Sequence, residues 1–324
     1  MEITTERFDR ARERIRAGDA DGLAALLAKE PELVRARRAG AETHYEGYFH
    51  RPTLLHHLAG NPLEVPVPAN ACELARVLLD RGAEVDAVTE QGPAQPNDVG
   101  WTTLGLAATS SEARASGVQR ELCELLVARG ADVNARRGGA LMGALYYGET
   151  EAAAHLVELG ADVDLVAAAG LGRLDLVERH LARAAGVAPR ERELTPDAHR
   201  LVHYSLVPLP ARESRADVLA LALCYAAKGG HTEVAERLIE LGADVSARAW
   251  FDHRATALHW AVLGDRPDTV RRLLDRGADP ELRDASFDST PAGWARHLER
   301  ARCAEALETN EPRRADEDDR GAGA

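Results

Sequence analysis

The sequence is poor in aromatic residues, which make up 4% of its 324 residues. It also lacks an excess of basic residues, because its formal net charge is −13. General nucleic-acid binding uses clustered lysine and arginine to displace counterions, so this charge argues against nucleic-acid partners and against an anionic membrane surface. The arginines are instead interspersed with acidic residues along predicted helices, which is typical of a solvated face.

No apolar run approaches the roughly 20 residues that a membrane-spanning helix needs. The polar start of the chain, MEITTERFDR, is not expected to act as a signal peptide. Cysteine is scarce, and none of the four cysteines belongs to a C-x-x-C pair: Cys72, Cys123, Cys224 and Cys303. We expect them to be small buried residues in a reduced cytoplasm, and a catalytic or zinc-binding cysteine is the alternative.

Motifs for several common site chemistries are also missing. The sequence contains no H-E-x-x-H, G-x-S-x-G, G-x-G-x-x-G or P-loop pattern. A metal site would need histidines and acids from distant segments to converge. We therefore predict neither a metal site nor a cofactor.

A recurring helical stripe is present. Five glycines each follow a leucine by four residues and an aliphatic residue by three, namely Gly82, Gly130, Gly160, Gly242 and Gly277. Positions three and four apart share one helical face, so each copy predicts a helix with a single apolar stripe. The glycine follows the helix end, where a left-handed backbone is favourable only without a Cβ.

One such helix pair cannot bury its own stripe, so several stacked copies are required. The intervals Gly130–Gly160 and Gly242–Gly277 each fit one repeat of about 33 residues. The interval Gly82–Gly130 fits one repeat with an insertion, and Gly160–Gly242 fits two repeats with an insertion. A degenerate copy is expected near Ala167–Leu181, which has the helix–turn–helix spacing but lacks the closing G-A-D.

The most regular copy, TALHWAVLGDRPDTVRRLLDRGADP, spans Thr256–Pro280. It contains T-x-L-H-x-A, with Ala257 where the ankyrin motif has proline, followed by L-L-x-x-G-A-D. The segment resembles an ankyrin repeat. This resemblance implies an all-α ankyrin-repeat solenoid of about eight helix–turn–helix repeats including caps, in a single domain over residues 1–309. We expect an N-cap near residues 5–36, a C-cap near 290–309 and a disordered acidic tail at 310–324.

The loops are unusually long for such an array. Long turns between repeats, here called fingers, are predicted at residues 37–52, 86–100 and 246–254. Insertions are predicted at 61–70, 109–116 and 185–214. Long irregular loops more often carry function than short uniform turns do, and the segments 61–70, 88–100 and 185–214 are candidates for closing a groove.

The resemblance implies that fingers and first helices line a concave binding side. Nearly all aromatic residues fall in these segments, and aromatic side chains dominate binding hot spots. The alternative for some of them is packing between repeats. The candidate ligand- or partner-binding residues are Tyr45, Tyr48, Phe49, His56, Trp101, Tyr146, Tyr147, Trp250, Phe251, His259 and Trp260.

Histidines also concentrate in these segments. In the ankyrin motif the histidine is usually structural, which applies to His259 and to one of His56 and His57. The candidates for acid–base chemistry are His50, His57 and His253, with Asp252 placed to orient the imidazole of His253.

Two functions are compatible with these features. The first is a cytoplasmic interaction module that binds a protein partner through its concave face and its aromatic and histidine-rich fingers. The alternative is a small-molecule pocket, or a cofactor-independent isomerase, cyclase or hydrolase that uses concave-face His, Tyr and Asp residues. The sequence leaves open whether the protein is an enzyme.

Overall fold

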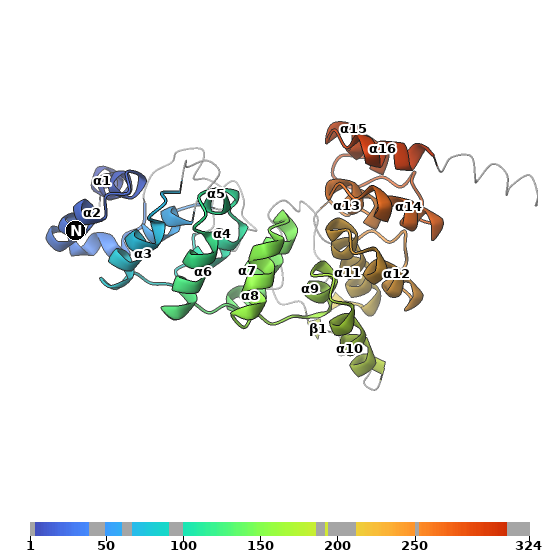
Figure 1. The fold of residues 1–324 in the computed structure, drawn as a ribbon, viewed down its shortest axis with the longest axis horizontal. Helices are drawn as coiled ribbons and strands as arrows, with labels where there is room; N and C mark the ends of the chain where they lie inside the picture. Colours follow the sequence, from blue (N-terminus) through green and yellow to red (C-terminus); the bar gives the residue numbers. More distant parts are fainter. Residues whose placement is uncertain are drawn as a thin grey trace, which may run out of the picture. The chain divides into compact units, whose positions relative to one another are not determined.

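The computed structural model describes residues 4–38, 49–59, 67–90, 100–185, 192–193, 212–249 and 253–309. These residues contain sixteen α-helices and one antiparallel pair of two-residue strands, β1 (Arg192–Glu193) and β2 (Arg212–Glu213). The fold of this part is therefore essentially all-α, as predicted (Figure 1). The described residues divide into two compact units, one within residues 1–162 and one from residue 163 onward.

The first unit is a series of helix pairs joined by turns. Its first helices include the 3-10 helix η3 and its second helices carry the predicted stripes. The elements are α1 (Thr5–Arg16), α2 (Ala20–Lys29), η1 (Pro31–Arg35), η3 (Leu55–Leu58), α3 (Ala71–Leu79), α4 (Thr103–Thr109), α5 (Ser111–Ala115), α6 (Gln119–Ala128), α7 (Ala135–Tyr147) and α8 (Thr150–Glu158).

The second unit continues the same alternation of first and second helices. The predicted degenerate copy forms a helix pair here, although it lacks the closing G-A-D. The elements are α9 (Leu165–Gly170), α10 (Leu174–Ala185), α11 (Arg215–Gly229), α12 (Thr232–Glu240), α13 (Ala257–Leu263), α14 (Pro267–Asp275), α15 (Pro291–His297) and α16 (Ala301–Glu308).

Within each unit, like helices pack on like helices. In the first unit η3 contacts α4, which contacts α7, while α3, α6 and α8 form the second layer. In the second unit α9, α11, α13 and α15 follow one another, and so do α10, α12, α14 and α16. The stripe of one second helix is buried by its neighbours in this way; in α12 it comprises Val234, Ala235 and Leu238.

All five predicted glycines adopt the left-handed conformation. Their φ angles lie between 86° at Gly277 and 99° at Gly160. At Gly242 the turn is closed by Ala243 N–H, which donates to the Leu238 carbonyl at 2.9 Å. Because a side chain is disfavoured in this conformation, glycine ends each of these second helices and turns the chain toward the next finger.

Two segments differ from the sequence expectation. The first helix of the second pair is the single 3-10 turn η3 rather than a full helix. The predicted polar insertion at residues 109–116 contains the helix α5. Ser110 caps this helix by accepting the Ala113 N–H at 3.0 Å, and Ala113 is buried. The capping serine and the buried alanine explain why a mostly polar segment folds locally.

Ion pairs join successive second helices on their outer side. Arg76 of α3 pairs with Glu121 of α6 at 2.9 Å, and Arg272 of α14 pairs with Glu236 of α12 at 3.1 Å. Each exposed pair contributes at most about 1 kcal/mol, so these contacts tune the packing of neighbours rather than hold the fold together. The interspersed arginines of the sequence are explained in part by this pattern.

The four cysteines are reduced and buried, as expected for small core residues. Burial raises the pKa of Cys72 to about 11 and that of Cys123 to about 12, so neither thiol forms a nucleophilic thiolate at neutral pH. Among the described residues, no helix has the length and apolar character to traverse a lipid bilayer.

The packing predicts a large cost for shortening a stripe residue. Leu238 is fully buried, so Leu238→Ala is expected to lower the free energy of unfolding of the second unit by about 2–5 kcal/mol. Urea denaturation followed by circular dichroism measures the change. The exposed Glu233→Ala on the same helix is the control; equal effects of the two substitutions would contradict the assigned core.

Candidate functional site

Two buried histidines fix the fingers to the first helices. Thr53 donates its backbone N–H to His56 Nδ1 at 3.0 Å, and its hydroxyl lies 2.8 Å from the same nitrogen. His56 Nε2 therefore carries the proton, which it donates to the carbonyls of Ala87 and Trp101 at 3.0 and 3.2 Å. His56, and not His57, is thus the structural histidine of this repeat.

His259 repeats this arrangement in the second unit. Its Nδ1 accepts from Thr256, and its Nε2 donates to the Ser289 carbonyl at 2.9 Å. Burial lowers the pKa of His259 and lowers that of His56 to about 4. Both side chains are fully buried, which argues against the direct partner contact that the sequence analysis allowed for them.

His57 and Phe49 belong to the core of the first unit. The His57 ring packs edge-on against Phe49 with the ring centroids 5.3 Å apart, and it lies 5.7 Å from Phe8 of α1. Burial moves the pKa of His57 well below its usual value. A general base must reach its substrate, so this packing argues against the acid–base role considered for His57.

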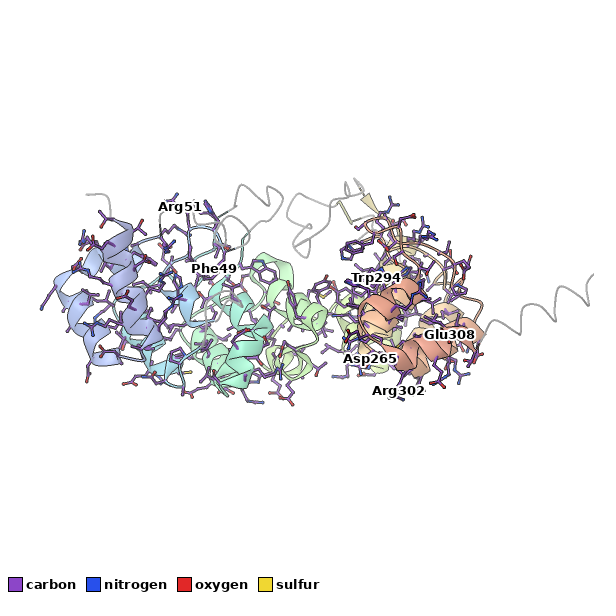
Figure 2. The ribbon with its side chains drawn as sticks, turned by 90° about the horizontal axis from the view of Figure 1, so that it is seen from above. Phe49, Arg51, Asp265, Trp294, Arg302 and Glu308 are labelled. Carbon is purple, nitrogen blue, oxygen red and sulfur yellow. The ribbon has the colours of Figure 1, made fainter. Side chains whose placement is uncertain are left out.

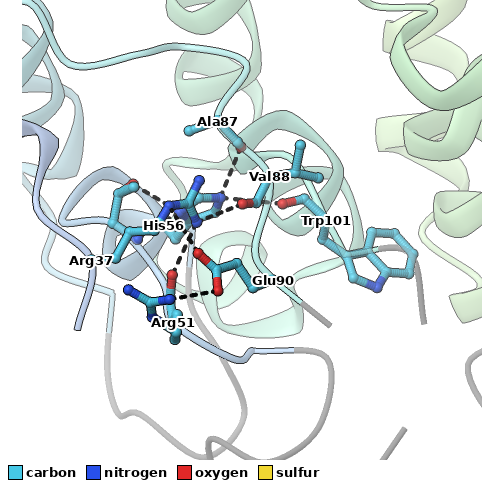
Figure 3. A network of polar contacts seen from close by, with 8 residues as sticks. Arg37, Arg51, His56, Ala87, Val88, Glu90 and Trp101 are labelled. Carbon is cyan, nitrogen blue, oxygen red and sulfur yellow. Dashed lines mark hydrogen bonds and ion pairs between the residues drawn. The ribbon is translucent and has the colours of Figure 1, made fainter. Parts of the chain in front are cut away.

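A polar network ties together three segments of the first unit (Figure 3). Arg37 Nη1 donates to the carbonyls of Val88 and Arg51 at 2.7 and 3.1 Å. Arg51 Nη1 pairs with Glu90 Oε2 at 2.9 Å, and Arg37 Nε lies 3.6 Å from Glu90 Oε1. The backbone N–H of Glu90 donates to the carbonyl of His50 at 2.8 Å, which places His50 beside the network.

Trp101 lies beside this network, and its indole packs over small residues of two first helices. A Cβ on Gly105 of α4 would lie 3.1 Å from the indole, and a Cβ on Gly143 of α7 would lie 3.0 Å from it. The indole is half-buried. Further along α7, the Tyr146 and Tyr147 rings meet edge-on at 5.1 Å, and Tyr147 is 43% exposed.

An aromatic cluster lies on the last finger of the second unit, residues 280–289, which leads into α15. The rings of His253 and Phe287 are 4.7 Å apart, and each also packs against Trp294 of α15. Trp294 is buried, whereas Phe287 is 64% exposed. Figure 2 shows the Trp294 side chain on α15.

The buried carboxylate of Asp284 organises this finger. Its Oδ1 accepts the backbone N–H groups of Ser286 and Phe287 at 2.8 and 2.7 Å. Its Oδ2 accepts from Ser289 N–H and from Trp294 Nε1 at 3.1 and 3.0 Å. Burial alone would raise the pKa of Asp284, but these hydrogen bonds lower it, so the side chain is ionised at neutral pH.

The remaining predicted site residues divide into two groups. Trp260 is buried against Tyr225, with the ring centroids 5.1 Å apart, so it acts as a packing residue. The others lie outside the described residues, and the structure does not test them: Tyr45, Tyr48, Trp250, Phe251 and Asp252. The predicted tail at 310–324 also lies outside that range.

The family comparison matches residues 198–284 to Ankyrin repeats, in three copies. A search of curated proteins found no match. Residues 198–284 are therefore ankyrin repeats, and such repeats are in general protein-interaction modules. The match does not include the first unit, where His56 forms the same pattern of hydrogen bonds as His259 does.

Asp284 and the arginines that follow His50 and His253 were not among the predicted site residues. A signal for the arginines was present, because H-R-x-T occurs both at His50–Thr53 and at His253–Thr256. Asp284 lies six residues before Thr290. Its role depends on the conformation of a turn that no local sequence motif predicts.

The depressed histidine pKa values predict acid sensitivity of the first unit. The unfolded chain takes up a proton on His56 below about pH 6.5, while the folded chain does so only near its pKa of about 4. Stability should therefore fall between these pH values by about 1.4 kcal/mol per pH unit for each such histidine. Urea unfolding followed by circular dichroism at each pH measures this slope.

His56→Gln cannot take up this proton, so its slope should be shallower, although the variant is less stable at neutral pH. The exposed His297→Gln is the control and should retain the wild-type slope. A wild-type stability that stays constant from pH 7 to pH 5 would contradict the assigned neutral histidines.

The hydrogen bonds of Asp284 predict that its charge matters more than its size. Asp284→Asn directs N–H donors toward existing donors, so we expect the second unit to lose about 1–3 kcal/mol of unfolding free energy. The exposed Asp288→Asn, at a left-handed position that asparagine tolerates, should have little effect. The stabilisation by Asp284 should disappear as the pH falls through its lowered pKa. Thermal unfolding of the two variants, compared at pH 7, tests the difference.

Proposed function

We propose that this protein binds a partner protein through its fingers and the adjoining first helices. The observation that carries the proposal is Phe287, whose side chain is 64% exposed on a finger that Asp284 organises. Aromatic anchors surrounded by packed neighbours are typical of binding hot spots.

The rigidity of the finger supports the same proposal. The Phe287 backbone is held by a buried carboxylate, and its ring rests on His253 and on the buried Trp294. A side chain that is ordered before binding loses little conformational entropy when a partner covers it. Such a surface suits the capture of an apolar side chain of the partner.

The first unit carries aromatic residues of its own that fit the same role. Trp101 and Tyr147 lie on the first-helix side, where the sequence analysis predicted contacts. The proposal keeps the single repeat domain over residues 1–309 and a cytoplasmic location, which the four buried thiols support.

The alternative, an acid–base enzyme or small-molecule pocket, has weaker support. Of its candidates, His57 is packed in the core, His253 stacks on Phe287, and His50 lies beside the arginine network through its backbone. Partner binding uses the exposed residues as they stand, and for that reason we favour it.

Site-specific photocrosslinking tests the proposal. A benzophenone amino acid at position 287 should form adducts with a polypeptide in extract of the source cells. The same group at the exposed Arg302 of α16 (Figure 2) is the matched control and should not form them. Phe287→Ala should remove capture of that polypeptide by affinity purification without lowering the unfolding temperature. Identical adducts at both positions would contradict the proposed surface.

A further inference from the structure

Two fingers, one in each unit, have the same backbone register. In the first unit Arg37 forms an isolated antiparallel bridge with Thr53, and in the second unit Arg248 forms one with Thr256. Both threonines begin the turn that is capped by the buried histidines described above. Arg248 therefore occupies the position of Arg37.

The hydrogen bond to the following finger extends this register. The carbonyl of His50 accepts the backbone N–H of Glu90 at 2.8 Å. The carbonyl of His253 accepts the backbone N–H of Ala285 at the same distance. Ala285 therefore occupies the position of Glu90, and a methyl group replaces the carboxylate.

The arginine after each histidine adopts an unusual backbone conformation. Arg51 has a φ of 46° and Arg254 has a φ of 48°. Gly100 and Asp288 occupy the corresponding positions before Thr102 and Thr290, with φ of 75° and 50°. The left-handed conformation is therefore a constant feature of this turn, and glycine adopts it at lower cost than arginine.

In the first unit the strained arginine has an internal partner. Glu90 pairs with Arg51 at 2.9 Å, and its other oxygen lies 3.6 Å from Arg37, so two arginines hold one carboxylate. In the second unit Arg248 and Arg254 are exposed. Within the described residues, neither of these two arginines forms an ion pair or a side-chain hydrogen bond with a carboxylate.

We infer that Arg248 and Arg254 bind an aspartate or glutamate side chain of the partner polypeptide, in the place that Glu90 fills in the first unit. Arginine suits this role because its planar guanidinium pairs with carboxylates through charge-assisted hydrogen bonds. The inference rests on the proposed partner binding and specifies the chemistry of the partner.

Phe287 defines the second element of recognition. It follows Ala285 by two residues on the same finger, and its exposed ring is held against His253. A partner segment that places its carboxylate over Ala285 therefore has an apolar surface next to it. The expected segment carries an acidic residue within a few positions of a large apolar one.

Selection of displayed peptides on the full-length chain tests this chemistry. A random dodecapeptide library on phage is selected on the wild-type protein and counter-selected on Phe287→Ala. We expect enriched peptides to combine Asp or Glu with a nearby aromatic or aliphatic residue. The affinity of synthetic versions is then measured by fluorescence anisotropy.

Two variants remove the carboxylate site without removing Phe287. Arg254→Gly replaces the strained residue with the one that this backbone favours, so the fold should be at least as stable as wild type. Ala285→Glu places in the second unit the carboxylate that Glu90 supplies in the first. This glutamate should pair internally with Arg254. Each variant should bind the enriched peptides about tenfold more weakly or worse, because a charge-assisted hydrogen bond is lost.

Arg51→Gly is the matched control, because it removes the equivalent arginine from the first unit, where Glu90 already fills the site. It should leave peptide affinity unchanged. Thermal unfolding of every variant establishes that a loss of affinity does not reflect loss of folding.

The outcomes separate the two claims. If no peptide is enriched on wild type relative to Phe287→Ala, the proposed function fails at this surface, and the inference fails with it. If peptides are enriched without acidic residues and bind Arg254→Gly and Ala285→Glu as tightly as wild type, partner binding stands and the carboxylate site is refuted. Enrichment of acidic peptides that Arg51→Gly also weakens would likewise refute it.

Discussion

In each unit, a buried, neutral histidine holds a finger in place by hydrogen-bonding in two directions. His56 accepts from the threonine three residues before it and donates to carbonyls of the next finger, and His259 does the same in the second unit. Because an imidazole loses hydration on burial, the arrangement is favourable only while both nitrogens are satisfied. The bond from Nε2 fixes the following finger to the adjoining repeat, so it helps to place the exposed side chains of that finger.

The helical layer of the fold followed from sequence because it is encoded locally. The leucine, aliphatic and glycine positions recur with fixed spacing, and each predicted glycine is left-handed in the structure. Side-chain exposure on the fingers was not encoded in this way. Phe49 and Phe287 both lie on fingers, yet Phe49 is covered by His57 whereas Phe287 remains exposed. What covers a finger residue is contributed by distant elements, so composition alone could not separate a core aromatic from a surface one.

The correspondence between the two arginine fingers was hidden for a related reason. Sequence alignment on the threonine–histidine motif brings Arg51 and Arg254 together, but Glu90 and Ala285 belong to the following fingers, whose lengths differ. Only the backbone hydrogen bonds to His50 and His253 establish that these two residues are equivalent. A repeat therefore supplies a constant backbone frame in which single side chains decide whether a charged group is satisfied within the chain or left exposed.

The distribution of thiols has a consequence for studying this protein. Cys72 and Cys123 lie in the first unit and Cys224 and Cys303 in the second, and all four are buried. A thiol reagent can reach them only when the surrounding helices open, so its rate of reaction reports the free energy of local opening. With single-cysteine variants, the natural residues become reporters at defined depths in each unit. The relative stability of the two halves can then be measured in the intact chain, without attaching a probe to the exposed fingers.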